Sequence, residues 1–489
     1  MQDLTAKELR SKIAARQVSS VDATETVFNA IDKLQPTVGA YLSTFKEQAL
    51  VQAREVDRKI AAGAAVGPLA GVPIAIKDIM CTTFGTTTCG SKILENFRAP
   101  YNATVVEKLL AADAVIIGKT NMDEFAMGSS TETSAFKRTV NPWDIKCVPG
   151  GSSGGSAVAV AAQMCFAALG SDTGGSIRQP AAFCGIVGLK PTYGRVSRYG
   201  LVAYGSSLDQ IGPITRTVSD AALIMNVIAG HDPADSTSIS AEFADVPDYS
   251  DRLDEPFDAL RIAVVPQFNK GADREVIESI NTAVEVYRKL GAEIVEVDMP
   301  HLDYAIAAYY VIATAEASSN LARYDGVHYG YRAKSPHDYI EVYTKSRAEA
   351  FGKEVKRRIM LGTYALSSGY YDAYYLKALK VRNLIRGDFT KVFDKCDCII
   401  MPVSPTTAFR IGEKMDDPLK MYLSDVYTIA ANLAGVPAIS IPCGFDNKGL
   451  PVGLQILTPP FQEEKLLRIA RMYESQTDWH KRRPPLLDT

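Results

Sequence analysis

Histidine is scarce in this sequence of 489 residues, and its scarcity disfavours the commonest catalytic arrangements. The histidines are His231, His301, His328, His337 and His480, and none lies in an apolar or glycine-rich stretch. Histidine is the usual proton acceptor for a nucleophilic serine. These positions are typical of solvated surface residues, so a nucleophile in this chain needs a different base.

Strong net charge, long apolar runs and metal-binding cysteine patterns are also missing. With 53 basic and 56 acidic residues the net charge is −3, so any nucleic acid has to be held by another chain. The longest apolar stretch, residues 157–169, is too short to span a bilayer, so no membrane association is expected. The scattered cysteines, Cys396 and Cys398 included, predict no metal site and a reducing compartment. The N-terminus lacks an apolar signal region, which favours the cytoplasm.

Two glycine-serine clusters are the most informative positive feature, PGGSSGGS at residues 149–156 and DTGGS at residues 172–176. Glycine lets the backbone approach a ligand closely, and consecutive N–H groups can stabilise an anion. Serine adds a hydroxyl that can attack a carbonyl carbon. Acyl transfer needs both, a nucleophile beside backbone donors for the oxyanion.

Other interpretations of these clusters fit less well. A flexible linker is opposed by the apolar residues 157–162, which follow at once and predict the start of a buried helix. A Walker A loop at residues 118–120 lacks its first glycine, because Asp113 occupies that position. The nucleophile-elbow pattern G-x-S-x-G fits residues 150–154, but residues 147–149 do not resemble the strand that should precede it.

Lys77 is the residue that could take the proton of a nucleophilic serine. It ends the apolar run 71–76, which predicts a short buried strand whose end lies at the rim where open sheets bind ligands. Burial lowers the pKa of a lysine and makes the neutral amine accessible. The alternative is a lysine that leaves the sheet for solvent beside Asp78.

Three segments in this order, GVPIAIKD (71–78), PGGSSGGS (149–156) and GSDTGGSIRQPA (170–181), resemble the amidase signature family. The resemblance implies amide hydrolysis by a Ser-Ser-Lys triad. In that triad Ser176 is the nucleophile, Ser152 the bridging serine after a cis peptide bond, and Lys77 the base. The amides of Thr173, Gly174 and Gly175, just ahead of the nucleophile, are then expected to form the oxyanion hole.

The resemblance continues over nearly the whole chain, toward family members that hydrolyse glutamine. It implies that Arg358 binds the α-carboxylate of glutamine, Asp425 its ammonium, and that Tyr309 closes the pocket. A free amino acid needs a cation and an anion for its two charged groups. Arg357 and Tyr310 are adjacent alternatives, although Arg358 lies nearer the apolar face of its segment. Asp425 is equally placed to cap a helix near residue 429, and the two arginines could form a solvated basic face.

For that branch of the family the resemblance implies an assembly with B and C subunits. The B subunit binds glutamyl-tRNA(Gln) and activates its carboxylate with ATP and Mg, the small C subunit accompanies both, and this chain supplies ammonia without a cofactor of its own. A free-standing amidase for another small amide would share the triad without needing Arg358 and Asp425. A catalytically silent scaffold is the third possibility, and the intact triad opposes it.

Apolar strand-like runs alternate with amphipathic helical segments, which predicts an α/β fold with a mixed central sheet flanked by helices. The expected strands are residues 72–76, 114–117, 165–169, 186–189, 262–265, 293–297, 398–401, 438–441 and 453–457; expected helices include 274–290 and 463–473. A helical N-terminal portion is expected at 4–62, and a mainly helical insertion with substrate-recognition residues at 303–394, including one helix over 370–393. No linker or repeat divides the chain, so residues 1–489 are expected to form one large domain with the layered amidase-signature fold.

Overall fold

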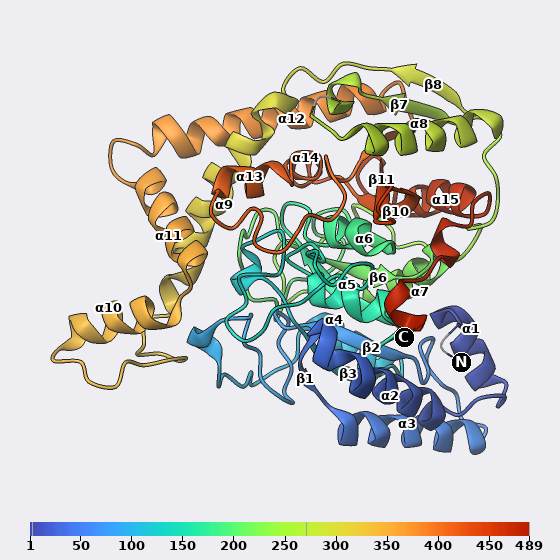
Figure 1. Cartoon of the computed structure of the whole chain (residues 1–489), viewed down its shortest axis with the longest axis horizontal. Helices are drawn as coiled ribbons and strands as arrows, with labels where there is room; N and C mark the ends of the chain where they lie inside the picture. The colour runs from blue at the N-terminus through green and yellow to red at the C-terminus, as the bar shows by residue number, and fades with distance from the viewer. Residues whose placement is uncertain (2, 270, 489) are drawn as a thin grey trace.

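A computed structural model of the chain describes residues 1, 3–269 and 271–488. Within them, one sheet of eleven strands has the order β1-β3-β2-β4-β6-β5-β10-β11-β9-β7-β8 and contains both parallel and antiparallel pairs. The strands are β1 (Tyr41–Thr44), β2 (Pro73–Lys77), β3 (Val115–Thr120), β4 (Ala167–Asp172), β5 (Val187–Lys190), β6 (Gln210–Thr215), β7 (Arg261–Val264), β8 (Glu293–Glu296), β9 (Cys398–Pro402), β10 (Ala438–Phe445) and β11 (Pro451–Leu457). Helices flank this sheet (Figure 1), which confirms the predicted α/β class.

Two of these strands, β1 and β6, are not predicted from the sequence, whereas the other nine are, with shifted ends. β6 contains Gly212 and Pro213, which normally interrupt a strand, yet it lies between β4 and β5 inside the sheet. β1 is short and pairs with β3 at the sheet edge, within the portion expected to be helical. Local sequence patterns therefore miss strands that tertiary pairing stabilises.

The helices gather in groups around the sheet (Figure 1). The expected helical N-terminal portion comprises α1 (Ala6–Ala14), α2 (Ser20–Val38) and α3 (Lys46–Ala61) beside β1 to β3. The segment 303–394 contains α9 (Ala305–Asn320), α10 (Tyr339–Ala350), α11 (Lys353–Leu366) and α12 (Lys377–Phe393), with a π-helical turn at Asp372–Leu376 just before α12. The other helices are α4 (Thr104–Ala111), α5 (Gly154–Ala161), α6 (Arg178–Cys184), α7 (Val218–Ile228), α8 (Arg274–Lys289), α13 (Pro418–Leu423), α14 (Ile429–Ala434) and α15 (Glu463–Glu474). In the part of the chain that the structure describes, no helix is both long and apolar enough to cross a membrane.

The two glycine-serine clusters lie where parallel strands end. β2 pairs in parallel with both β3 and β4, so the carboxyl ends of these strands share one edge of the sheet. Lys77 is the last residue of β2 and Asp172 the last of β4. α5 begins at Gly154 inside the first cluster, and α6 begins at Arg178, two residues after the end of the second. The topology thus places both clusters and Lys77 at the same edge.

Candidate active site

Lys77 contacts two serines at this edge. Its Nζ donates hydrogen bonds to Ser152 Oγ at 2.7 Å and to Ser171 Oγ at 2.9 Å. Lys77 and Ser152 are fully buried, and the peptide bond between Gly151 and Ser152 is cis, as predicted. The lysine therefore points into the protein rather than to solvent. It lies within hydrogen-bonding distance of Ser152, the serine that is expected to relay a proton from the nucleophile to the base.

Ser176 is the most exposed of the three proposed triad residues, at 8%. It lies in the turn between β4 and α6, and its carbonyl accepts a hydrogen bond of 3.1 Å from the N–H of Ser153. That hydrogen bond holds the turn that contains Ser176 against Ser153, which follows Ser152 in the sequence. Lys77 and Ser152 are fully buried whereas Ser176 is slightly exposed, which suits an accessible nucleophile and a buried base.

Burial lowers the pKa of Lys77 to about 7, although the nearby carboxylates of Asp123 and Asp172 act in the opposite direction. Removing an ammonium from water disfavours its charged form. A large fraction of Lys77 is consequently neutral near pH 7 and able to accept a proton.

The backbone amides ahead of Ser176 are not all available to an oxyanion. The N–H of Gly175 donates a hydrogen bond of 2.8 Å to Asp172 Oδ1. Among the described residues, the N–H groups of Thr173, Gly174 and Ser176 donate to no acceptor. The backbone N–H groups available to an oxyanion are therefore those of Thr173, Gly174 and Ser176. The expected donors are Thr173, Gly174 and Gly175, but the N–H of Gly175 already donates to Asp172.

Arg358 is buried in α11, with its side chain 3% exposed. Its Nε pairs with Glu354 Oε1 at 2.7 Å, and its Nη1 donates to the hydroxyl of Tyr204 at 2.5 Å. The guanidinium also lies over the ring of Tyr310, 5.3 Å from the ring centroid. Arg357 differs, because its side chain is 43% exposed. The structure thus separates the two arginines, and Arg358 is the one placed as an interior cation.

Asp425 is a buried carboxyl group that contacts Tyr310. Its Oδ2 accepts hydrogen bonds from Ser129 Oγ at 2.6 Å and from the hydroxyl of Tyr310 at 3.4 Å. Burial raises its pKa to about 7. Its side chain does not cap α14, whose N-cap residue is Thr428. The capping alternative is therefore wrong, and the carboxylate is left for the interior of the site.

Tyr309 and Tyr310 both face the site rather than one of them facing solvent. The ring of Tyr309 packs on Gly174, since a Cβ built on that glycine would lie 2.6 Å from the tyrosine hydroxyl. The ring of Tyr310 stacks on Tyr422, with 3.9 Å between ring centroids. Tyr309 is thus the member of the pair next to the turn that contains Ser176 (residues 173–177, the nucleophile turn). Tyr310 is the member next to Arg358 and Asp425.

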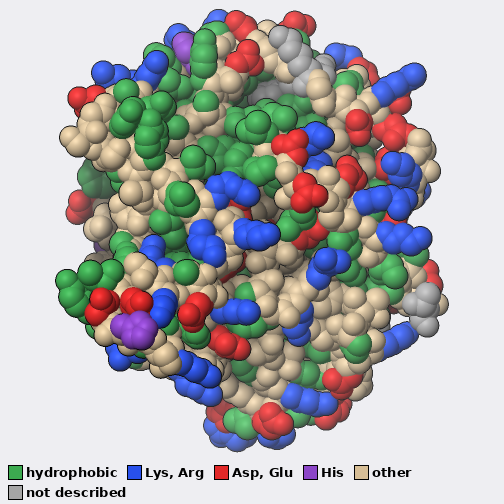
Figure 2. Space-filling model, turned by 60° about the vertical axis from the view of Figure 1, so that its left-hand side comes forward, with side chains coloured by type: hydrophobic (Ala, Val, Ile, Leu, Met, Phe, Trp, Pro, Cys, Tyr) green, Lys and Arg blue, Asp and Glu red, His purple; other side chains and the backbone are tan. Residues whose placement is uncertain are grey.

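A cavity of about 260 Å³ opens beside these residues. Its lining comprises Glu124, Gly128, Ser130, Thr133, Gly352, Lys353, Glu354, Arg357, Arg358, Lys414, Met415, Pro418, Met421 and Tyr422. Figure 2 brings the side of α9 to α11 forward, and Lys and Arg side chains gather across the middle of that view. A larger hollow of about 570 Å³ lies against α12. None of the triad residues lines either cavity, but Arg358 and Glu354 line the smaller one, which therefore adjoins the proposed glutamine-binding residues.

Several residues of the site are not found from the sequence. Ser171 lies within the segment GSDTGGS, so it could have been considered as a partner of Lys77. Glu354 precedes Arg358 by four residues, a spacing that places both on one helix face. Ser129 reaches Asp425 across 296 residues of sequence, and no local pattern marks that contact.

The chain belongs to the amidase family, whose model, described as Amidase, matches residues 22–467. It is 59% identical over 484 residues to the A subunit of the glutamyl-tRNA(Gln) amidotransferase of Carboxydothermus hydrogenoformans, with 99% of each chain covered. Among solved structures it is similar to the A subunit of the glutamyl-tRNA(Gln) amidotransferase of Thermotoga maritima, at 44% identity and a TM-score of 0.80, covering 97% of this chain and 95% of that chain. A peptide amidase is 31% identical, with a TM-score of 0.83 and 98% of each chain covered. The family resemblance and the predicted fold are confirmed.

Proposed function

We propose that this chain is the glutaminase subunit of a tRNA-dependent amidotransferase, which supplies ammonia for converting glutamyl-tRNA(Gln) to glutaminyl-tRNA(Gln). Full-length relatives named for that reaction support the assignment. The observation that carries it is the presence of two buried side chains of opposite type, the guanidinium of Arg358 and the carboxyl of Asp425. Arg358 lines the cavity, and Asp425 begins the turn whose Thr428 contacts Gly174. A free amino acid requires both, whereas an uncharged amide requires neither.

The chemistry follows from the order of the triad. Ser176 Oγ attacks the side-chain carbonyl carbon of glutamine, and its proton passes through Ser152 to the neutral amine of Lys77. Free backbone amides hold the oxyanion of the tetrahedral intermediate. The proton returns through Ser152 to the leaving nitrogen, ammonia departs, and a γ-glutamyl ester remains on Ser176. Water then attacks the ester and releases glutamate by the same proton path.

The remaining functions of the assembly fall to partner chains, its B and C subunits. The B subunit holds glutamyl-tRNA(Gln) and activates its carboxylate with ATP and Mg, and the small C subunit completes the complex. The net charge of −3 supports a division in which this chain does not itself hold the tRNA. All eight cysteines are free and buried, which supports a reducing compartment, the cytoplasm.

The test measures ammonia release from glutamine by the full chain, alone and with co-expressed partner subunits, and formation of glutaminyl-tRNA(Gln) with ATP and Mg. The expected result is glutamine hydrolysis that the variant Ser176→Ala lacks. Hydrolysis of butyramide or peptide amides without glutamine hydrolysis would instead identify a free-standing amidase. A folded chain that hydrolyses no amide, either alone or with its partner subunits, would be a catalytically silent scaffold.

A further inference from the structure

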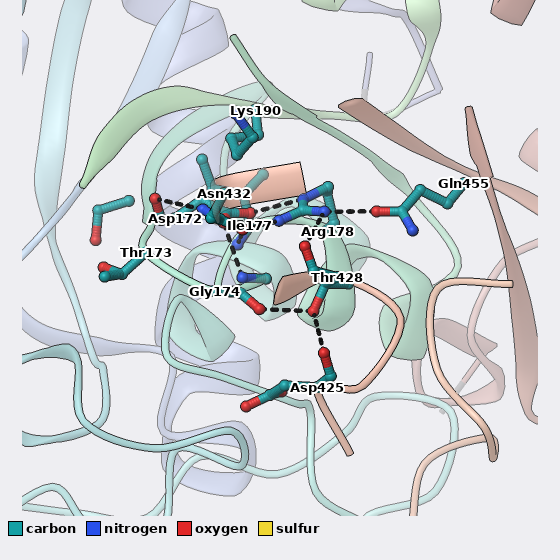
Figure 3. Close-up of polar contacts among 12 residues, drawn as sticks. Asp172, Thr173, Gly174, Ile177, Arg178, Lys190, Asp425, Thr428, Asn432 and Gln455 are labelled. Carbon is teal, nitrogen blue, oxygen red and sulfur yellow. Dashed lines mark hydrogen bonds and ion pairs between the residues drawn. The ribbon is translucent and has the colours of Figure 1, made fainter. Parts of the chain in front are cut away.

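The peptide bond between Gly174 and Gly175 is held at both of its polar atoms (Figure 3). The carbonyl of Gly174 accepts a hydrogen bond of 2.6 Å from Thr428 Oγ1, and the N–H of Gly175 donates one of 2.8 Å to Asp172 Oδ1. A Cβ on Gly175, whose φ is 132°, would lie 2.2 Å from Thr428 Oγ1. This peptide cannot rotate without breaking two buried hydrogen bonds.

Thr428 uses its hydroxyl in an unusual way for its position. It is the N-cap residue of α14, where a threonine side chain normally accepts a hydrogen bond from the helix, yet no such bond forms. The fully buried hydroxyl has one proton, and the carbonyl of Gly174 at 2.6 Å is closer than that of Asp425 at 3.1 Å. The hydroxyl therefore serves the nucleophile turn instead of its own helix.

The turn from Asp425 to Thr428 and the nucleophile turn form one connected unit. The backbone carbonyl of Thr428 accepts a hydrogen bond of 3.0 Å from Arg178 Nη1. Arg178 Nη2 donates in turn to Asp172 Oδ1 at 2.9 Å, and Asp172 holds the amide of Gly175. Figure 3 shows Thr428 between Gly174 and Asp425, with Arg178 on its other side.

We propose that Thr428 is a positioning residue for amide hydrolysis: its hydroxyl fixes the Gly174–Gly175 peptide and so aims the neighbouring amides of Gly174 and Ser176 at the oxyanion. The proposal rests on the amidase chemistry proposed for Ser176. Loss of the hydroxyl leaves the carbonyl of Gly174 without its buried donor, and the peptide is free to turn. Stabilisation of the oxyanion falls while substrate binding is retained, so kcat changes and KM does not.

The experiment compares Thr428→Val, Thr428→Ser and wild type in the full chain with its partner subunits. The matched control is Thr24→Val, which removes an equally buried hydroxyl from α2, where Thr24 Oγ1 donates to the carbonyl of Ser20 at 2.8 Å. The substrates are glutamine and butyramide, which is glutamine without its two charged groups. For Thr428→Val we expect kcat to fall roughly 10- to 100-fold on both substrates, with the KM for glutamine within about threefold of wild type. Thr428→Ser and Thr24→Val should stay within about threefold of wild type in kcat.

Other results would overturn the proposal. A rise in the KM for glutamine alone would mean that Thr428 shapes the ammonium pocket. A serine variant as slow as the valine variant would show that the methyl group matters rather than the hydroxyl. Equal losses in Thr428→Val and Thr24→Val, with equally lowered melting temperatures, would indicate a structural role only. A wild type that hydrolyses butyramide but not glutamine would instead contradict the proposed glutaminase function. The kcat values of the variants on butyramide would then still test the role of Thr428.

Discussion

Lys77 Nζ lies 2.7 Å from Ser152 Oγ, and neither side chain is exposed to solvent. This contact replaces the serine–histidine pair of other hydrolases, in a chain whose few histidines are absent from the site residues described above. A lysine can act as the base only when it is neutral, and burial brings its pKa to about 7. The burial of this pair is therefore a condition of the activity.

The pH dependence of butyramide hydrolysis should report the ionisation of Lys77. The protonated amine cannot accept a proton, so kcat/KM should rise with pH through about 7 and then level off. Butyramide has no charged group, so the ionisation of Asp425 does not enter its profile. Stopped-time ammonia assays from about pH 5 to about pH 9, at intervals of about half a unit, would measure this curve. A profile flat across neutral pH would contradict a lysine base.

The same base can be tested by substitution. Lys77→Met keeps an unbranched side chain and removes the amine, and we expect kcat to fall about 10²- to 10⁴-fold, the usual contribution of a general base. Lys119→Met serves as a comparison, because Lys119 is equally buried and one strand away but donates to the carbonyl of Met80 and to Thr87 instead of to a triad serine. A folded Lys77→Met variant with turnover within a few-fold of wild type would exclude this role.

The acyl-enzyme should form on Ser176 and on no neighbouring serine. Ser153 Oγ and Ser156 Oγ are committed to backbone carbonyls of β4, at 3.1 Å and 3.0 Å, and both residues are fully buried. When a reaction that contains glutamine as substrate is quenched and its peptides are mapped by mass spectrometry, a γ-glutamyl adduct should be found on residue 176. Hydroxylamine should intercept that ester as the hydroxamate. An adduct on Ser153 or Ser156 would overturn the assignment of the nucleophile.

Much of the site could be predicted because its chemistry is concentrated in short segments. Lys77 follows an apolar strand, and Ser152 and Ser176 lie in glycine-rich turns, so their types and neighbours already indicate acyl transfer. The glutamine-binding residues have no comparable local signal. Arg357 and Arg358 are adjacent in sequence, and only the packing of α11 buries one and exposes the other.

The contacts that could not be predicted depend on long-range packing. Ser129 and Asp425 meet only after the sheet has brought their segments together, and Thr428 reaches Gly174 across 254 residues. β6 escapes prediction for the same reason, since neighbours on both sides stabilise a strand that contains Gly212 and Pro213. Periodicity reports on local burial, and it carries no information on which distant group satisfies a buried polar atom.

Arg358 and Arg357 offer a matched pair of substitutions for glutamine recognition. Arg358→Met should raise the KM for glutamine about 10- to 100-fold, because the α-carboxylate loses a charge-assisted hydrogen bond worth roughly 1.5–3 kcal/mol. Arg357→Met removes a half-exposed guanidinium from the cavity lining and should change KM by less than about threefold. Butyramide hydrolysis should be unaltered in both variants. Equal losses on glutamine and butyramide would assign Arg358 a structural role.

The ionisation of Asp425 should make the preference for glutamine over butyramide depend on pH. Burial raises its pKa to about 7, so below that pH the carboxyl becomes neutral and binds the glutamine ammonium poorly. The ratio of kcat/KM for glutamine to kcat/KM for butyramide cancels the ionisation of Lys77, since both substrates need the same base. We expect this ratio to fall about tenfold from pH 8 to pH 6, as a single ionisation near pH 7 requires. Asp425→Asn retains the shape of the side chain and should give a lower ratio that does not vary over this range. A wild-type ratio independent of pH, or an asparagine variant that keeps the pH dependence, would place the ammonium site elsewhere.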